Sequence, residues 1–274
     1  MPGTKWLIFI FVLFVASLNN AGVAVLPTSD EPGHTGTVFV LASPDASRSF
    51  LSFFHSERLE VSNSLRKAIS QSRLVVIEGY LWELPNAAAA ISEVVAVARA
   101  AGVQVALTAG DPGVVSRHRE EILSVLKAAG KDILFFSNRE EACELQGKAR
   151  TSSAQTVAAE LGTLCSIAVV TDGSAGSYVS CMGQVHVVPP IEAPHGGVVV
   201  DTCGAGDGYA AGFCFALMMG HDCATAGVFA SSTAAQIIAR HGAQLLEEEA
   251  EELVMLLPKH TTFSSLMPPS LHSV

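Results

Sequence analysis

The chain has 274 residues, of which 49% are hydrophobic and 15% are charged. This composition excludes a disordered or fibrous chain and is typical of a globular protein with one large core or two smaller ones. Asp and Glu outnumber Lys and Arg by 26 to 16, which gives a net charge of −10 and argues against nucleic acid as a partner.

The first predicted elements form a β-hairpin. Residues 38–41 and 50–54 are short apolar strands, and the turn between them carries Pro44 and Asp45. A helix is predicted from about Ser62.

Strands and helices alternate over the middle of the chain. Strands are predicted at residues 73–79, 103–108, 132–137 and 166–171, and helices at residues 86–101, 114–129 and around 156–161. Continuous Val, Ile and Leu strands separated by helices are typical of parallel pairing with both faces covered. The sequence therefore predicts an α/β fold with a layered, mostly parallel sheet, and ligands at the carboxyl ends of the strands.

The second half is predicted to hold a further hairpin and three helices. The hairpin strands are residues 177–181 and 184–188, and the helices are residues 208–219, 224–240 and 245–257. The first two of these helices are rich in Ala, Gly and Ser, which permits close packing. Residues 259–274 are predicted to be a frayed tail.

The most informative segment is Asp-Thr-Cys-Gly-Ala-Gly-Asp at residues 201–207. Gly204, Ala205 and Gly206 leave backbone N–H groups unobstructed before a helix, so they predict a site for a phosphate or a developing oxyanion. A carboxylate at Asp207 would repel that ligand unless it accepts a proton from an attacking hydroxyl, which suggests phosphoryl transfer. The alternative is that Asp207 only caps the helix and the glycines only tighten a turn.

Four motifs, in this order, resemble those of the ribokinase-like (PfkB-type) carbohydrate and nucleoside kinases. They are Asn-Arg-Glu-Glu at 138–141, Thr-Asp-Gly-Ser-Ala-Gly at 171–176, the segment 201–213, and Arg-His-Gly-Ala at 240–243. The resemblance covers about residues 21–257, and Glu-Gly-Tyr-Leu-Trp-Glu-Leu-Pro at 78–85 leans toward the adenosine-kinase-like branch. It implies a ribokinase-like fold in which residues 37–55 form a small β lid.

The resemblance also implies roles for individual residues near the acceptor. Asp207 would be the general base, and Gly204, Ala205 and Gly206 would form the anion hole for the transferring phosphoryl group. Asp201 would contact the acceptor or help to organise a cation loop.

The nucleotide side follows from the same resemblance, which implies ATP and Mg²⁺ as cofactors and a monovalent cation such as K⁺ as a further candidate. Glu141 would hold Mg²⁺ through water. The residues that would bind the nucleotide are Asn138, Thr171, Gly173, Gly176 and Gly242. For Asn138 and Glu141 the alternative is helix capping, and for residues 171–176 it is a tight turn. His241 is interpreted as a favourable cation at a helix end or a surface residue, and not as a ligand.

The start of the chain departs from the family. The family's first strand with Gly and Asp or Asn, and its Gly-Gly turn for the acceptor, have no counterpart, because the one Gly-Gly pair is at residues 196–197. Residues 1–24 instead hold Lys5 and an apolar stretch at 6–16, which resembles a secretory signal peptide and is too short to span a bilayer stably. A truncated or atypical start is favoured over secretion, because little ATP is available outside the cell. This places the kinase domain at 25–258, in the cytoplasm or an organelle.

Two functions remain open at this stage. The leading one is transfer of the γ-phosphoryl group of ATP to a hydroxyl of a sugar or nucleoside, with a homodimer through the lid as an accompanying hypothesis. The alternative is a catalytically impaired nucleotide-binding or partner-binding remnant that lacks the acceptor half of the site. A Rossmann dinucleotide enzyme is disfavoured because the glycine-rich turn comes late in the chain.

The cysteines predict neither a zinc site nor a disulfide framework. There are six, without a Cys-x-x-Cys pair. They are interpreted as reduced thiols, mostly in the core.

Overall fold

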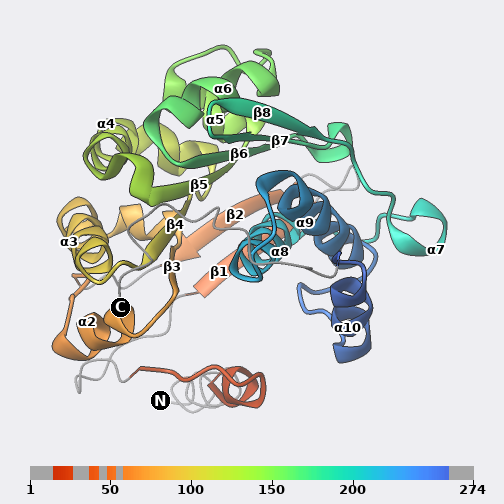
Figure 1. Ribbon diagram of the computed structural model, residues 1–274, viewed down its shortest axis with the longest axis horizontal. Helices are drawn as coiled ribbons and strands as arrows, with labels where there is room; N and C mark the ends of the chain where they lie inside the picture. Colours follow the sequence, from red (N-terminus) through yellow and green to blue (C-terminus); the bar gives the residue numbers. More distant parts are fainter. Residues whose placement is uncertain (1–14, 27–36, 43–47, 54–57, 259–274) are drawn as a thin grey trace.

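The computed structural model of the chain describes residues 15–26, 37–42, 48–53 and 58–258 (Figure 1). The predicted frayed tail, residues 259–274, and most of the apolar N-terminal stretch lie outside the described residues. Among the residues that are described, no helix is both long enough and apolar enough to cross a membrane.

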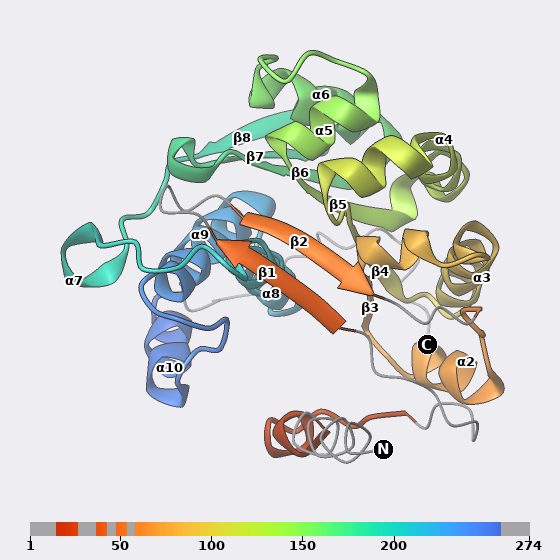
Figure 2. The ribbon, with the colours of Figure 1, turned by 180° about the vertical axis from the view of Figure 1, so that it is seen from behind.

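The predicted lid hairpin is confirmed. Strand β1 (Thr37–Ala42) pairs antiparallel with β2 (Arg48–Phe53), while the turn with Pro44 and Asp45 lies outside the described residues. The lid is a separate two-stranded sheet, and it crosses in front of helix α8 in the view of Figure 2. The register places four apolar side chains on one face of the lid, each more than half exposed: Phe39, Leu41, Leu51 and Phe53.

The main sheet has six strands in the order β3-β4-β5-β6-β7-β8. Strands β3 (Leu74–Ile77), β4 (Gln104–Thr108), β5 (Ile133–Asn138) and β6 (Ile167–Thr171) are parallel. Strands β7 (Ser177–Cys181) and β8 (Gln184–Val188) continue the sheet as an antiparallel hairpin. The mostly parallel α/β sheet predicted from the sequence is therefore confirmed.

One face of the sheet is covered by the helix that precedes β3 and by the helices that connect the parallel strands. They are α2 (Asn63–Ser70), α3 (Ala87–Ala100), α4 (Pro112–Ala129), α5 (Arg139–Gln146) and α6 (Ala154–Leu164). Alternate strand residues such as Leu107 and Phe135 enter this core, while Ala106 and Phe136 point to the other face. Both faces of the central strands are therefore buried, as is typical of parallel sheets, whereas Val76 in the edge strand β3 is 58% exposed.

The other face is covered by α8 (Ala205–Met218) and α9 (Cys223–Ile238), with α10 (Glu247–Met255) beyond them (Figure 1). Helices α8 and α9 run antiparallel in close contact. A Cβ atom added at Gly208 would lie 2.9 Å from Cγ1 of Ile237, and one at Gly212 would lie 2.5 Å from Oγ1 of Thr233. This close approach is the physical reason for the small residues of the pair.

Several boundaries differ from the predicted ones. Helix α8 begins at Ala205 instead of residue 208. Helix α10 begins only at Glu247, because the Glu249 carboxylate accepts a hydrogen bond from the Leu246 N–H and so closes the start of the helix there. Shorter elements that the sequence did not predict are the 3-10 turns η1 (Gly79–Glu83), η2 (Gly130–Asp132) and η3 (Gly173–Ala175), and α7 (Pro194–Gly197), which holds the Gly-Gly pair.

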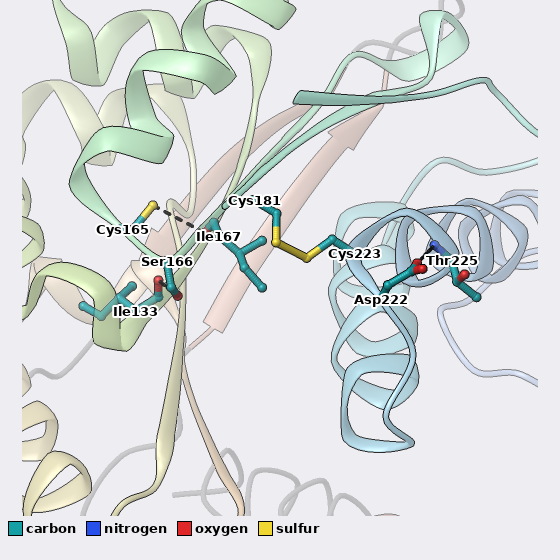
Figure 3. Close-up of a disulfide and its surroundings, with 8 residues drawn as sticks. All are labelled: Ile133, Cys165, Ser166, Ile167, Cys181, Asp222, Cys223 and Thr225. Carbon is teal, nitrogen blue, oxygen red and sulfur yellow. Dashed lines mark hydrogen bonds between the residues drawn. A yellow bond between two sulfur atoms is a disulfide. The ribbon is translucent and has the colours of Figure 1, made fainter. Parts of the chain in front are cut away.

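The prediction that all six cysteines are reduced is wrong for one pair. Cys181, the last residue of β7, forms a disulfide with Cys223, the first residue of α9 (Figure 3). The two lie 42 residues apart in the sequence and meet only because α9 packs against β7. The free cysteines among the described residues are Cys143, Cys165 and Cys214, which are buried, and Cys203, which is exposed.

Candidate active site

Polar side chains gather at the carboxyl edge of the parallel strands. Glu78 follows β3 and Thr108 ends β4, and the Thr108 hydroxyl donates to Oε1 of Glu78 at 2.7 Å. The Gly79 N–H donates to both side chains. A Cβ atom at Gly79 would lie 2.4 Å from the carbonyl carbon of Ala109, so the two strand ends can approach this closely only with glycine there.

Asn138 and Glu141 form a capping box at the start of α5. The Asn138 side chain accepts from the Glu141 N–H at 2.9 Å, and the Glu141 carboxylate accepts at 2.7 Å from both the backbone N–H and the side-chain amide of Asn138. Glu141 is only 8% exposed, and burial raises the pKa of its carboxyl to about 7 despite the backbone hydrogen bond. Asn138 and Glu141 therefore do cap the helix, as the alternative interpretation of this motif predicted. Each oxygen keeps a further lone pair for a metal-bound water.

Replacing Glu141 with Gln should change how stability depends on pH. A carboxyl with a pKa of about 7 when folded, against 4.5 ordinarily, gives the folded state more bound protons in that range. The contribution of Glu141 to the free energy of unfolding should therefore be most favourable below pH 4.5 and should fall by up to about 3 kcal/mol as the pH rises to about 7. Melting temperatures measured in chelator from about pH 4 to about pH 9 should show the wild type losing stability relative to Glu141→Gln as the pH rises, with the difference levelling off above about pH 7. A difference that is constant with pH would contradict this.

The turn between β6 and β7 lies beside Asn138, because Asn138 and Thr171 are register partners at the ends of β5 and β6. The turn closes through the Asp172 N–H, which donates to the Gly176 carbonyl at 2.8 Å. Gly173 and Gly176 of this turn both have positive φ. A Cβ at Gly176 would lie 2.2 Å from the Val188 carbonyl oxygen, whereas a Cβ at Gly173 would meet no atom within 4 Å. Gly176 is thus required by packing, and Gly173 is the position that is open to a ligand.

The loop before α8 has the features expected of an anion site. Gly204 is the N-cap in the left-handed conformation (φ +78°), and glycine has no side chain to accept from the N–H groups of the first turn. Gly206 and Asp207 are exposed in that turn, and a Cβ at Gly206 would meet no atom within 4 Å. The start of α8 therefore presents N–H groups, open space and one carboxylate together.

A second loop packs against this one. A Cβ at Gly204 would lie 2.4 Å from Cβ of Ala243, which follows Gly242 (φ +90°). Asp201 orders the loop itself, since its Oδ1 accepts from the Cys203 N–H at 2.8 Å, and its Oδ2 lies 3.9 Å from Nδ1 of His241. The structure thus brings together Asp201, Gly242 and the loop of residues 204–206, which we call the anion loop.

A buried hydrogen bond joins the helix that follows the anion loop to the strand that follows the turn at residues 171–176. The hydroxyl of Tyr209, in the second turn of α8, lies 2.7 Å from Oγ of Ser177. Ser177 starts β7 and is the register partner of Thr171. The anion loop is therefore held at the same edge of the sheet as the Thr171 turn.

Tyr80 lies within electrostatic range of carboxylates from both α8 and the ends of the parallel strands. Its pKa is raised to about 12, first by burial and then by the charges of Asp111, Glu141, Glu78 and Asp207. Asp207 on α8 therefore acts on the same phenol as the three carboxylates at the ends of β3, β4 and β5. So many carboxylates near an anion loop need a cation to balance them.

Mg²⁺ would fit this set of donors if a bound phosphate ligand contributed further oxygens. The described residues contain no group of three or more His, Cys, Asp or Glu side chains that could hold a metal ion by themselves. Mg²⁺ keeps several waters and is usually bound by one or two carboxylates together with substrate phosphates, so a complete protein cage is not required.

Sequence reasoning missed four members of this edge: Glu78, Tyr80, Thr108 and Asp111. Each lies at or just after the carboxyl end of a predicted strand, which is the signal that could have identified them. Asp111 also caps α4, accepting from the N–H groups of Gly113 and Val114.

The fold is that of the ribokinase-like class, and sequence comparison agrees. The profile of the pfkB family carbohydrate kinases matches residues 13–250, so the chain belongs to this family. The adenosine kinase of Sinorhizobium meliloti is similar in structure, with a TM-score of 0.77 and 27% identity over 90% of this chain and 74% of that one. A probable sugar kinase from Rhizobium etli, at 24% identity and a TM-score of 0.76, shares the fold over 90% of this chain and 73% of its own.

The curated relatives match shorter stretches. A nucleoside kinase of Methanocaldococcus jannaschii is 35% identical over 92 residues, which are 34% of this chain and 30% of the relative. A 5-dehydro-2-deoxygluconokinase of Shouchella clausii is 27% identical over 179 residues, which are 63% of this chain and 52% of the relative. The chain therefore spans about a third to a half of these relatives. The ribokinase-like resemblance, on the adenosine-kinase side, is confirmed.

Proposed function

We propose that this chain transfers the γ-phosphoryl group of ATP to a hydroxyl of a sugar or nucleoside. The observation that carries the proposal is the start of α8, where Asp207 stands exposed beside an open glycine loop at the carboxyl edge of the sheet. A carboxylate there is useful only if a proton must be accepted next to a bound anion. Membership of the pfkB family supports the same reaction class.

The chemical step assigns one task to each group of this loop. Asp207 accepts the proton of the acceptor hydroxyl while that oxygen attacks the γ-phosphorus, and the bond from that phosphorus to the oxygen of ADP breaks. The N–H groups of Gly204, Ala205 and Gly206 stabilise the charge on the transferring phosphoryl oxygens. Asp201 holds the acceptor or orders the loop that faces it.

The nucleotide lies across the Thr171 turn in this proposal. Asn138, Thr171 and Gly173 contact it, Gly176 shapes the turn, and Gly242 borders it from the second loop, where a monovalent cation such as K⁺ would also bind. Mg²⁺ would neutralise the phosphate charge, and Glu141 would hold it through water. Pairing of two copies through the lid remains part of the proposal, supported by the exposed apolar face of β1 and β2.

Calorimetric titration of the full chain with MgATP tests the first requirement. Binding should raise thermal stability, by about 2.7 kcal/mol at a hundredfold excess over the dissociation constant. ADP release should then follow on at least one acceptor from a panel of ribose, fructose, adenosine and inosine. Binding without turnover on any acceptor would favour the remnant function, and absence of binding at millimolar MgATP would overturn both.

Gly206→Ala separates folding from chemistry at the same loop. The added methyl group meets no protein atom within 4 Å and lies in a helix, where alanine is favoured over glycine by about 1 kcal/mol, so the melting temperature should hold or rise. The methyl group would occupy the open space that the phosphoryl group needs, so turnover should fall by at least about tenfold, or about 1.4 kcal/mol of barrier. Unchanged turnover would contradict the anion-hole assignment.

A further inference from the structure

The two nucleotide motifs are linked by a pair of charged residues, one inside each motif, to which no role has been assigned so far. Asn138 and Thr171 are paired at the ends of β5 and β6. Arg139 follows Asn138 in the sequence, and Asp172 follows Thr171. Nη1 of Arg139 lies 3.3 Å from each carboxylate oxygen of Asp172. One ion pair thus joins the first residue of α5 to the residue before Gly173.

Asp172 controls the shape of the turn through its backbone. Its N–H donates to the Gly176 carbonyl at 2.8 Å, and its carbonyl accepts from the Ala175 N–H at 3.0 Å. The Asp172 side chain is only 17% exposed, so solvent screens this ion pair less than it screens a pair on the surface. Fixing the Asp172 side chain therefore fixes the residue on which the turn closes.

Arg139 has donors left over after this contact. Its Nε is buried and has no hydrogen-bond partner among the described residues, while the side chain as a whole is 41% exposed. A buried donor without an acceptor is unfavourable unless water or a ligand fills the place. This indicates that the pair borders a site that something polar occupies.

We infer that Arg139 and Asp172 are a positioning pair that sets the Thr171–Gly176 turn against the start of α5 and thereby sets the affinity for nucleotide. The inference rests on the proposed function and names two residues that none of the motif assignments included. The neighbouring pair Arg150 and Glu140 offers a matched control, because it has the same 3.3 Å separation and also involves α5 but does not touch the turn.

The experiment compares Arg139→Gln, Asp172→Asn, the double variant and Arg150→Gln in the full chain. Both single variants should weaken MgATP binding by about five- to tenfold, and the double variant by no more than either. The KM for the acceptor should stay within about twofold, and Arg139→Lys should recover part of the affinity. Hydrogen exchange of the Asp172, Ala175 and Gly176 amides should be faster in both single variants and unchanged in Arg150→Gln.

The outcomes separate the inference from the proposed function. If the wild type binds MgATP and the single variants bind it equally well, the positioning role is wrong and the kinase assignment stands. If Arg139→Gln weakens binding but Asp172→Asn does not, Arg139 contacts the phosphates directly and the pair does not position the turn. If the wild type binds no MgATP, both the proposed function and the inference are overturned, whatever the exchange rates show.

Discussion

Asp207→Asn should lower kcat by about 10²- to 10⁴-fold, or about 3 to 5 kcal/mol of barrier, while MgATP still binds. The substitution keeps the size of the side chain and the N–H groups of the first turn of α8 but removes the group that accepts the proton. Because a negative charge disappears from an anion site, MgATP affinity should hold or rise. Calorimetry for binding and ADP release for turnover measure the two quantities on one variant.

A matched substitution tests whether a carboxylate at any helix start would give the same result. Asp222 caps α9, where its Oδ1 accepts from the Thr225 N–H at 2.7 Å (Figure 3), and α9 begins at the end of the helix pair that lies away from the site. Asp222→Asn should leave kcat of the folded protein unchanged. If Asp207→Asn also kept wild-type turnover on an acceptor of the panel, Asp207 would be a helix-capping residue and not the base.

The fold was predictable because its signals are local. Each parallel strand is a short run rich in Val, Ile, Leu or Phe, and helices separate these strands along the chain, which is typical of a parallel sheet buried on both faces. Helix α5 escaped prediction because Arg139–Gln146 is short and begins with three charged residues. Its start was noticed only as the motif Asn-x-x-Glu, whose two residues form a capping box in the structure.

The site was predictable only where its residues are close together in the sequence. The loop at residues 201–207 and the turn at residues 171–176 can be recognised in the sequence by their glycines, which have positive φ or face open space. The contacts from Thr108 to Glu78, from Arg139 to Asp172 and from Tyr209 to Ser177 span about thirty residues each. No spacing rule links such residues, because the pairing depends on strand order and on how α8 lies on the sheet.

Removing the Cys181–Cys223 disulfide should lower the free energy of unfolding by about 4 kcal/mol, because the bond closes a loop of 42 residues in the unfolded chain. For a chain of this size the melting temperature should fall by roughly 10 °C. Cys181→Ser with Cys223→Ser, and reductant added to the wild type, should give the same shift. Reductant should then have no further effect on the double variant.

The site should survive this loss. Cys181 pairs with Ile167 at the start of β6, whereas Ser177 pairs with Thr171 at its end, so the disulfide fastens α9 at the edge of the sheet opposite to the anion loop. The Tyr209–Ser177 hydrogen bond still holds α8 at the site, so MgATP affinity of the folded double variant should stay within about twofold of wild type. Cys203→Ser, at an exposed free thiol, is the control and should not change the melting temperature. If mass spectrometry of the unreduced protein found all six thiols free, Cys181 and Cys223 would only be neighbours, and the stability of this helix layer would come from packing alone.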